Sequence, residues 1–382
     1  MKIQLPKDVS FILDTYLKNG YQAFIVGGCV RDALLGKTPT DYDICTNALP
    51  KETLKLFSDF RIIETGIKHG TVTLLLDSVP YEITTFRTDG DYLDSRHPQS
   101  VSFVTNIEED LKRRDFTVNA MAYNQTDGLI DLYGGQKDLE NKIIRCVGNS
   151  EQRFTEDALR IMRAIRFCAT LDFAIEDKTK EAIFKLKSNL LNIAKERINV
   201  EFTKTLLSDN TKVYSEYYEI FKLFFKPSPK LDAKKLVKLP KDLEIRLSYL
   251  LLSSGLDADV LEALRYSSKT VKTVNEVIKN FNSPCESIKD LRLLISQSSY
   301  ETANIILTIK SKNDMLSQVK DMPCKICDLK ICGDDLIGLG IKDGLLIGKI
   351  LKKLLYLVID EKCENTQKSL MQQAKKLMEE IK

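Results

Sequence analysis

Two aspartates near the amino-terminal end have the type and spacing of metal ligands. Asp41 and Asp43 stand two apart in segment 41–46, whose alternating character predicts a β-strand. Alternate strand residues project to one face at a Cα separation of roughly 6 to 7 Å, so both carboxylates can reach one cluster of ions. Oxygen ligands suit Mg²⁺, which keeps several waters and is completed by substrate phosphates. The pair predicts Mg²⁺-dependent phosphoryl transfer, although D-x-D alone would favour a solvated strand end.

A glycine turn upstream of the aspartates strengthens that prediction. An apolar strand at 23–26 ends at Gly27 and Gly28, and a short helix that contains Arg31 follows. Backbone N–H groups at such a turn can face phosphates, and Arg31 adds positive charge beside them. A Gly-Gly turn alone is weak evidence, because many strand-to-helix corners use glycine for steric reasons. Together with the aspartate pair it favours a triphosphate site.

Two arginine-rich segments follow. The first, L-K-R-R-D-F-T-V-N-A-M-A-Y at 111–123, places Arg113 and Arg114 directly before Asp115, and alone it fits a helix start with a run of surface charge.

The second, E-D-A-L-R-I-M-R-A-I-R-F at 156–167, is predicted to be helical. Steps of three residues then place Asp157, Arg160 and Arg163 on one side, with Arg166 farther round the helix. Taken alone, this segment fits an ordinary helix with i,i+3 ion pairs, which contribute little energy.

Together these segments resemble the nucleotidyltransferase superfamily to which DNA polymerase β belongs. The similarity is closer to class II, the tRNA nucleotidyltransferases (CCA-adding enzymes) and bacterial poly(A) polymerases. It rests on I-V-G-G-C-V-R-D-A-L-L-G at 25–36, D-Y-D-I-C-T at 41–46, R-R-D-F-T-V-N-A at 113–120 and E-D-x-x-R at 156–160. Specific motifs extend to Phe167, segment 195–206 looks like a neck helix, and the match after Cys332 is loose.

The resemblance implies a set of catalytic and nucleotide-binding residues. They are Asp41 and Asp43 as catalytic Mg²⁺ ligands, Gly28 and Arg31 at the triphosphate, Arg114 and Asp115 at the nucleotide and its ribose, Asp157 and Arg160 at the base, and Arg163 and Arg166 at the base, sugar or phosphates.

The chemistry of the bases agrees with the role that the resemblance gives to the E-D-x-x-R segment, that of a protein template. Cytosine offers an amino donor at N4 beside an acceptor at N3, and adenine offers the same order at N6 and N1. The Asp157 carboxylate can accept from the amino group while the Arg160 guanidinium donates to the ring nitrogen. Uracil and guanine present the reverse order, which would leave buried polar groups unpaired.

Segment 84–103, T-T-F-R-T-D-G-D-Y-L-D-S-R-H-P-Q-S-V-S-F, is predicted to be a mobile loop. Its polar candidates are Arg87, Asp94, Arg96 and His97. In the family that it resembles, such a loop accompanies addition of the terminal A, and enzymes restricted to adding CC lack it. Its presence argues against a CC-only enzyme.

The elements that must position these residues divide the chain in two. Short β-rich runs at 23–26, 71–76 and 81–86 predict a small mixed sheet with flanking helices, and helical spacing dominates from about residue 154. The resemblance implies an α+β fold, with a polymerase-β-like nucleotidyltransferase head followed by an all-helical neck, body and tail. The predicted parts are a head at 1–148, a helical neck with the nucleotide-selecting helix at 149–208, a helical body at 209–330 and a helical, tRNA-binding tail at 331–382.

Composition restricts where the protein acts. The sum of 57 Lys and Arg against 54 Asp and Glu gives +3, so any contact with a polyanion must be local. No apolar run approaches the roughly 18 residues of a spanning helix, which predicts no membrane contact. Nine cysteines without a signal-peptide pattern predict reduced thiols in a cytoplasm.

The resemblance implies template-independent addition of C, C and A to the 3′ acceptor end of tRNA, with CTP and ATP as substrates and release of pyrophosphate. The alternatives are an A-adding tRNA nucleotidyltransferase, a poly(A) polymerase and a catalytically silent RNA-binding protein of the same fold. Segment 59–65, D-F-R-I-I-E-T, lacks the basic G-R-R-F-like stretch expected of bacterial poly(A) polymerases. The intact Asp41 and Asp43 argue against a silent protein.

Overall fold

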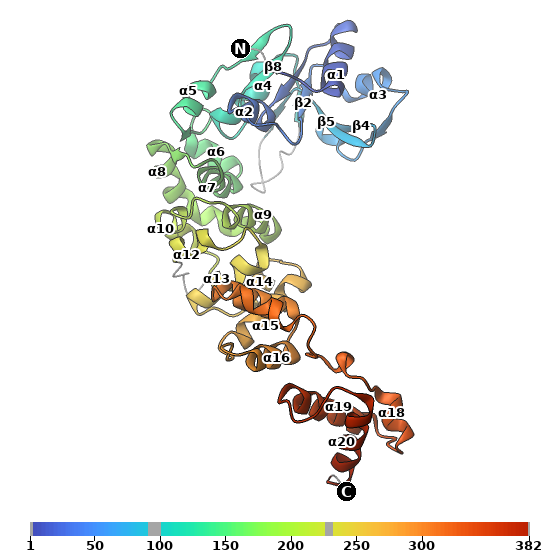
Figure 1. The fold of residues 1–382 in the computed structure, drawn as a ribbon. Helices are drawn as coiled ribbons and strands as arrows, with labels where there is room; N and C mark the ends of the chain where they lie inside the picture. Colours follow the sequence, from blue (N-terminus) through green and yellow to red (C-terminus); the bar gives the residue numbers. More distant parts are fainter. Residues whose placement is uncertain (1–2, 91–100, 226–231, 381–382) are drawn as a thin grey trace. The chain divides into compact units, whose positions relative to one another are not determined.

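The computed structural model describes residues 3–90, 101–225 and 232–380 of the 382-residue chain. The chain divides into two compact units, Met1–Leu223 and Phe224–Lys382, and Figure 1 shows the elements of each. Unit 1 contains a mixed sheet and helices, whereas the described part of unit 2 is helical. The α+β fold class is therefore confirmed, and the division into four parts stays a prediction.

Unit 1 contains a seven-stranded mixed sheet with the strand order β3-β4-β5-β2-β1-β8-β9 (Figure 1). Its strands are β1 Ala23–Val26, β2 Ile44–Thr46, β3 Arg61–Ile63, β4 Thr71–Leu76, β5 Val79–Thr85, β8 Ala122–Asn124 and β9 Gly128–Ile130. Strand β2 is antiparallel to β1 and parallel to β5. The three predicted strands at 23–26, 71–76 and 81–86 correspond to β1, β4 and β5.

Apolar residues of the central strands bury one face of this sheet against α4 (Ile107–Lys112). Phe24 of β1 and Cys45 of β2 form a core cluster with Ile107 and Leu111, one helical turn apart on α4. This packing fixes the residues that immediately follow α4, the arginine-rich segment at 113–115, relative to the middle of the sheet. At roughly 25 cal/mol per Å² of apolar area, such burial is the main force that holds the segment in place.

The other elements of unit 1 are mostly helical. They are α1 Lys7–Lys18, α2 Gly28–Leu34, α3 Pro50–Leu56, α5 Gly135–Glu140, α6 Ser150–Glu156, α7 Leu159–Leu171, α8 Asp177–Leu186, α9 Lys195–Leu206, α10 Val213–Glu216 and α11 Tyr218–Phe221, with short 3₁₀ turns η1 Ile67–His69, η2 Thr117–Asn119 and η3 Lys187–Asn192. Two short strands, β10 Ile143–Ile144 and β11 Ala174–Ile175, pair in parallel. The predicted neck is therefore not all helical, because 174–175 pairs with a strand from the head.

Helix α7 begins later than predicted, and this changes the site. The pattern at 156–167 predicted one continuous helix, but α6 ends at Glu156 and α7 begins at Leu159. Asp157 between them has extended backbone angles, φ −139° and ψ 102°, and its side chain accepts a hydrogen bond from the Leu159 N–H. A short polar side chain that bonds to the backbone two residues ahead competes with the helical hydrogen bond, which explains the break.

Segment 84–103 is described only at its two ends. Strands β6 (Arg87–Asp89) and β7 (Val101–Phe103) pair antiparallel, with Arg87 opposite Phe103. The predicted polar residues Asp94, Arg96 and His97 lie outside the described residues.

The regular elements of unit 2 are all helices among its described residues. They are α12 Ala233–Lys238, α13 Leu243–Ser254, α14 Asp259–Ala263, α15 Ser268–Asn280, α16 Ile288–Gln297, α17 Tyr300–Ile309, α18 Gly333–Gly338, α19 Gly344–Ile359 and α20 Gln367–Glu379, with η4 Asn313–Val319 and η5 Ile326–Asp328. Leu336, Ile350, Leu354 and Leu370 belong to one apolar cluster that joins α18, α19 and α20. None of the helices that the structure describes is both long and apolar enough to span a membrane.

Candidate active site

Both predicted metal ligands lie in an exposed segment directly before β2, a central strand of the sheet, with one residue between them. The strand is shorter than predicted, because it begins at Ile44 and leaves Asp41 and Asp43 ahead of it. The carbonyl oxygen of Asp43 nevertheless accepts from the Val26 N–H at 3.0 Å, which extends the β1–β2 pairing by one residue. This bond anchors the aspartate segment beside the end of β1, where the glycine turn starts.

Glu82 is a third carboxylate that sequence reasoning missed. It is exposed on β5, next to Ile83, which pairs with Ile44 of β2. Desolvation raises the pKa of Asp43, the charge of Arg114 lowers it, and the charges of Asp41 and Glu82 raise it again, so the net shift is upward. A divalent cation bound here would neutralise this excess of negative charge. Strand order cannot be read from local pattern, so the sequence did not place Glu82 here.

The acidic residues of the described chain do not form a complete cage. No group of three or more His, Cys, Asp or Glu side chains among the described residues converges tightly enough to hold a metal ion. An open pair of carboxylates fits Mg²⁺, since that ion usually takes one or two protein carboxylates and draws its other ligands from water and substrate phosphates.

The glycine turn brings Arg114 against the backbone of the sheet. Gly27 has φ 77°, and a Cβ at this position would lie 3.1 Å from Arg114 Nη1. The left-handed backbone therefore favours glycine at 27, and the Arg114 guanidinium would have to shift to admit a side chain there. A Cβ at Gly28 would meet Arg31 Nη2 at 3.7 Å, an ordinary contact.

Arg31 connects α2 to the R-R-D segment. Its Nη1 donates to Asn119 Oδ1 at 2.8 Å, while Nε and Nη2 donate to the two carboxylate oxygens of Asp32 at 2.8 and 2.9 Å. Its guanidinium carbon also lies 5.3 Å from the centre of the Phe167 ring on α7. The predicted triphosphate residue thus lies beside the predicted nucleotide-binding segments.

A buried carboxylate, Asp110, holds both arginines of the R-R-D motif. It accepts from Arg113 Nη2 at 2.7 Å and from Arg114 Nη2 at 3.1 Å, and its side chain is fully buried. Burial raises the pKa of Asp110, but the charges of Arg114 and Arg113 outweigh it and the net shift is downward. Sequence reasoning missed Asp110, although its spacing of three and four residues from the arginines is a signal for such pairs.

Asp115 is paired with Arg163 across the two arginine-rich segments. Its Oδ2 accepts from Arg163 Nε at 2.8 Å and Nη2 at 2.6 Å, and its Oδ1 accepts from the Phe116 N–H and from Asn119. Burial raises the pKa of Asp115, but Arg163 and its hydrogen bonds lower it to about 2. The sequence predicted both residues for the nucleotide site, and the structure brings them together.

The pair predicts a stability difference that depends on pH. Because the pKa of Asp115 is depressed in the fold to about 2, its stabilising effect is complete well above the unfolded value and is lost as the pH falls through the folded value. Asp115→Asn is expected to lower the free energy of unfolding by about 2 to 3 kcal/mol at pH 7 and by roughly half as much at pH 3. Urea titrations of both proteins at the two pH values measure this. An equal loss at pH 7 and pH 3 would contradict the assignment.

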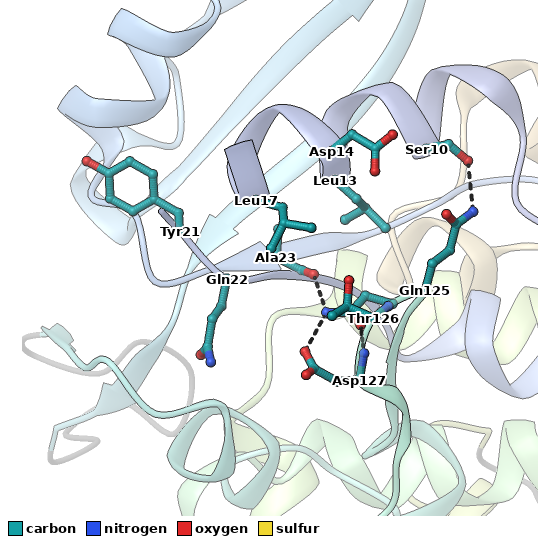
Figure 2. Close-up of a pocket in the computed structure, with 11 residues that line it drawn as sticks. Ser10, Leu13, Asp14, Leu17, Tyr21, Gln22, Ala23, Gln125, Thr126 and Asp127 are labelled. Carbon is teal, nitrogen blue, oxygen red and sulfur yellow. Dashed lines mark hydrogen bonds between the residues drawn. The ribbon is translucent and has the colours of Figure 1, made fainter. Parts of the chain in front are cut away.

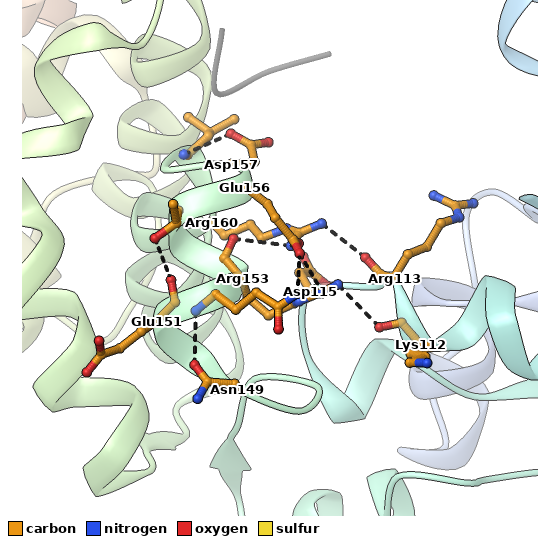
Figure 3. A network of polar contacts seen from close by, with 12 residues as sticks. Lys112, Arg113, Asp115, Asn149, Glu151, Arg153, Glu156, Asp157 and Arg160 are labelled. Atoms are coloured by element: carbon orange, nitrogen blue, oxygen red, sulfur yellow. Dashed lines mark hydrogen bonds and ion pairs between the residues drawn. The ribbon is translucent and has the colours of Figure 1, made fainter. Parts of the chain in front are cut away.

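Asp157 and Arg160 lie close in sequence but contact different partners. Asp157 Oδ2 accepts from Arg197 Nη2 of α9 at 2.8 Å, whereas Arg160 Nη1 donates to Glu156 Oε2 at 2.9 Å. Arg160 also donates to the carbonyl oxygens of Arg153 and Arg113, and Figure 3 shows this network around Glu156. The expectation that Asp157 shares a helix face with the arginines is wrong, because the helix breaks at Asp157.

Arg163 and Arg166 converge on α9 and on one aromatic ring. Arg166 Nε lies 2.5 Å and Arg163 Nη1 3.6 Å from the carboxylate oxygens of Glu201, which is buried. Their guanidinium carbons lie 3.8 and 5.4 Å from the centre of the Phe167 ring. Burial lowers the pKa of Arg166, and the charge of Glu201 offsets part of this shift. Sequence reasoning missed Glu201 because its partners are distant in the sequence. It gave Phe167 no role because an apolar residue in a helix carries no chemical signal.

Arg87, at the start of the partly described loop, is tied to the same network. Its backbone N–H donates to Asp110 Oδ1 at 3.4 Å, and its carbonyl oxygen accepts from Arg113 Nε at 3.1 Å. Its guanidinium also donates to the His69 carbonyl oxygen. The base of the loop therefore shares Asp110 with the R-R-D motif.

A crevice between α1 and the β8–β9 turn lies apart from this network. Figure 2 shows Gln125 Nε2 donating to Ser10 Oγ, at 3.5 Å, at one end of it. Asn124 on its wall donates to the carbonyl oxygen of Ala23 at 3.2 Å and so closes the start of β1. The residues that line the crevice include none of the predicted site residues.

The mixed sheet, the exposed aspartate pair beside the glycine turn and the arginine network define a nucleotidyltransferase of the polymerase β type. Three family models match: the poly(A) polymerase head domain at residues 23–145, a probable RNA- and SrmB-binding site of polymerase A at 172–231, and a putative tRNA nucleotidyltransferase domain 2 at 244–374.

Similar proteins extend the match over nearly the whole chain. The CCA-adding enzyme of Ligilactobacillus salivarius is 40% identical, covering 97% of this chain and 96% of that enzyme, and the one of Enterococcus faecalis is 36% identical over 97% and 96%. The crystal structure of the Bacillus stearothermophilus CCA-adding enzyme in complex with CTP has a TM-score of 0.83 and 29% identity, covering 98% of each chain. The chain belongs to the family of CCA-adding enzymes, the class II tRNA nucleotidyltransferases related to poly(A) polymerases.

Proposed function

We propose that this protein adds C, C and A in turn to the 3′ acceptor end of tRNA, with CTP and ATP as substrates. The observation that carries the proposal is the exposed Asp41–Asp43 pair beside a partly buried arginine network, in a chain that matches CCA-adding enzymes along 97% of its length. Solved relatives include a Thermotoga maritima CCA-adding enzyme complexed with tRNA_CCA, whose 22% identity supports the fold alone.

The reaction joins the 3′-hydroxyl oxygen of the tRNA to the α-phosphorus of the nucleotide. The bond from that phosphorus to the bridging oxygen breaks, and pyrophosphate leaves. Asp41 and Asp43 would hold Mg²⁺, which when bound supplies activation of the hydroxyl and neutralises charge on the phosphates. The positive charge of Arg31, beside Gly28, would hold the triphosphate in line with that hydroxyl.

Selection of the nucleotide falls to the residues around α7. Asp115 and Arg114 hold the sugar side, and Asp157 and Arg160 meet the base. A guanidinium has five N–H donors, and the three hydrogen bonds that Arg160 makes to described residues leave donors for a ring nitrogen. Arg163 and Arg166 hold the base, sugar or phosphates from the Glu201 side.

The remaining assignments follow from this function. The head at 1–148, neck at 149–208, body at 209–330 and tail at 331–382 are the proposed division of labour, with the body and tail holding the acceptor arm through phosphate and shape contacts. All nine cysteines are free thiols, which agrees with a cytoplasmic location. The charge of the bound RNA is met by local lysines and arginines, since the net charge is only +3.

Three tRNA substrates test the proposal. They end at the discriminator base, after one C and after two Cs, and each is incubated with Mg²⁺ and labelled CTP or ATP. We expect CMP on the first two and AMP on the third. Incorporation of AMP into the third substrate, without incorporation of CMP into the other two, would indicate an A-adding enzyme. Addition of many successive AMP residues to all three substrates would indicate a poly(A) polymerase.

A further inference from the structure

Helix α9 carries two charged residues that face the nucleotide-selecting segment, and the reaction described above leaves both without a role. Arg197 and Glu201 are four residues apart, so they lie on one face of α9 a turn from each other. Arg197 pairs with Asp157, and Glu201 pairs with Arg163 and Arg166. Three of the predicted nucleotide contacts, Asp157, Arg163 and Arg166, therefore have a partner of opposite charge on α9.

The contacts of Asp157 fix the direction of its carboxylate. Oδ1 accepts from the Leu159 N–H at 3.0 Å, and Oδ2 accepts from Arg197 Nη2 at 2.8 Å. Arg197 Nη1 also lies 3.5 Å from Oδ1, so the planar guanidinium meets both oxygens. The side chains are partly buried, with 15% of Asp157 and 24% of Arg197 exposed, which limits screening by solvent.

A carboxylate held in this way still has acceptor capacity. Two oxygens offer about four lone-pair positions, and the two short bonds use one on each oxygen. The free positions can accept only from a donor, such as the amino group of cytosine or adenine, and they repel a carbonyl oxygen. A carboxylate that can turn enforces this distinction less, because it can move away from a mismatched base.

We infer that Arg197 is a positioning residue for base selection, which fixes the Asp157 carboxylate so that it accepts the amino group of C or A and rejects the carbonyl of U or G. This inference rests on the proposed function. It gives the neck helix α9 a part in specificity although neither Arg197 nor Glu201 needs to touch the nucleotide.

The test is the ratio of kcat/KM for CTP to that for UTP, measured on a tRNA that ends at the discriminator base. Both values come from one enzyme preparation, so a loss of folded protein cancels from the ratio. Arg197→Met keeps the aliphatic stem and removes the donors, and we expect it to lower the ratio by about tenfold or more, since unpaired polar groups discriminate bases by such factors. Arg197→Lys keeps a charge but has no planar fork, and we expect it to restore part of the ratio.

Arg145→Met is the matched control. Arg145 also pairs with two carboxylates, Asp138 at 3.0 Å and Glu176 at 3.1 Å, and neither belongs to the proposed site. We expect it to keep the wild-type ratio. An unchanged ratio in Arg197→Met, or an equal fall in Arg145→Met, would overturn the inference. Failure of the proposed function itself is a different result, because the wild-type enzyme would then incorporate no CMP.

Discussion

Asp43→Ala is expected to abolish transfer of CMP and AMP while the protein stays folded. Loss of a metal ligand removes several kcal/mol of transition-state stabilisation, which corresponds to a rate lower by about a thousandfold or more. The upward shift in the pKa of Asp43 means that the fold disfavours its charged form relative to the unfolded chain, so removal of this carboxylate is not expected to lower stability.

Single-turnover incorporation of labelled CMP, together with urea denaturation, measures both halves of this prediction. Asp59→Ala is the matched control, because Asp59 is exposed in the same unit and has no proposed role. Asp41→Ala is expected to behave like Asp43→Ala. Normal incorporation by either variant would refute the metal assignment, whereas an inactive variant that is also unfolded would not support it.

Asp110→Ala is expected to have the largest effect on stability. The Asp110 carboxylate is fully buried and neutralises Arg113 and Arg114, so its removal leaves two partly buried cations without their shared partner. Breaking a buried ion pair in this way costs about 3 to 5 kcal/mol. Because Arg114 lies under the glycine turn, the folded fraction is also expected to bind CTP about tenfold more weakly, the size of one lost charged contact.

Urea midpoints and the KM for CTP report these two effects. Glu109→Ala, next in sequence, removes an exposed carboxylate that is 3.8 Å from Lys112, and it is expected to cost less than about 1 kcal/mol. If Asp110→Ala unfolded at the same urea concentration as Glu109→Ala, the anchoring role of Asp110 would be wrong.

Local pattern predicted the elements whose signals are short-range. The predicted strand at 23–26 and the predicted neck helix at 195–206 match β1 and α9, because the residues that define each element are close together in the sequence. The break at Asp157 escaped prediction because E-D-A-L-R-I-M-R fits an uninterrupted helical pattern. The competing hydrogen bond from Asp157 to the backbone is visible only in three dimensions.

The candidate site also contains residues that local sequence motifs predicted and residues that they did not. Motifs predicted Arg114, Asp115 and Arg163, and the Asp115–Arg163 pair links two of these segments in the structure. The partners that orient them, such as Glu82 and Glu201, depend on strand order and helix packing, which one sequence does not specify. The motifs therefore predicted the site residues but not the charged residues that pair with them.

The central claim is that three nucleotides are added in a fixed order without a nucleic-acid template. Its most direct test is the mass of a tRNA that ends at the discriminator base after incubation with the protein, Mg²⁺ and all four nucleoside triphosphates. We predict one main product, heavier by two CMP residues and one AMP residue, with pyrophosphate released in proportion. A product with no added C, or a ladder of AMP residues without C, would contradict the account.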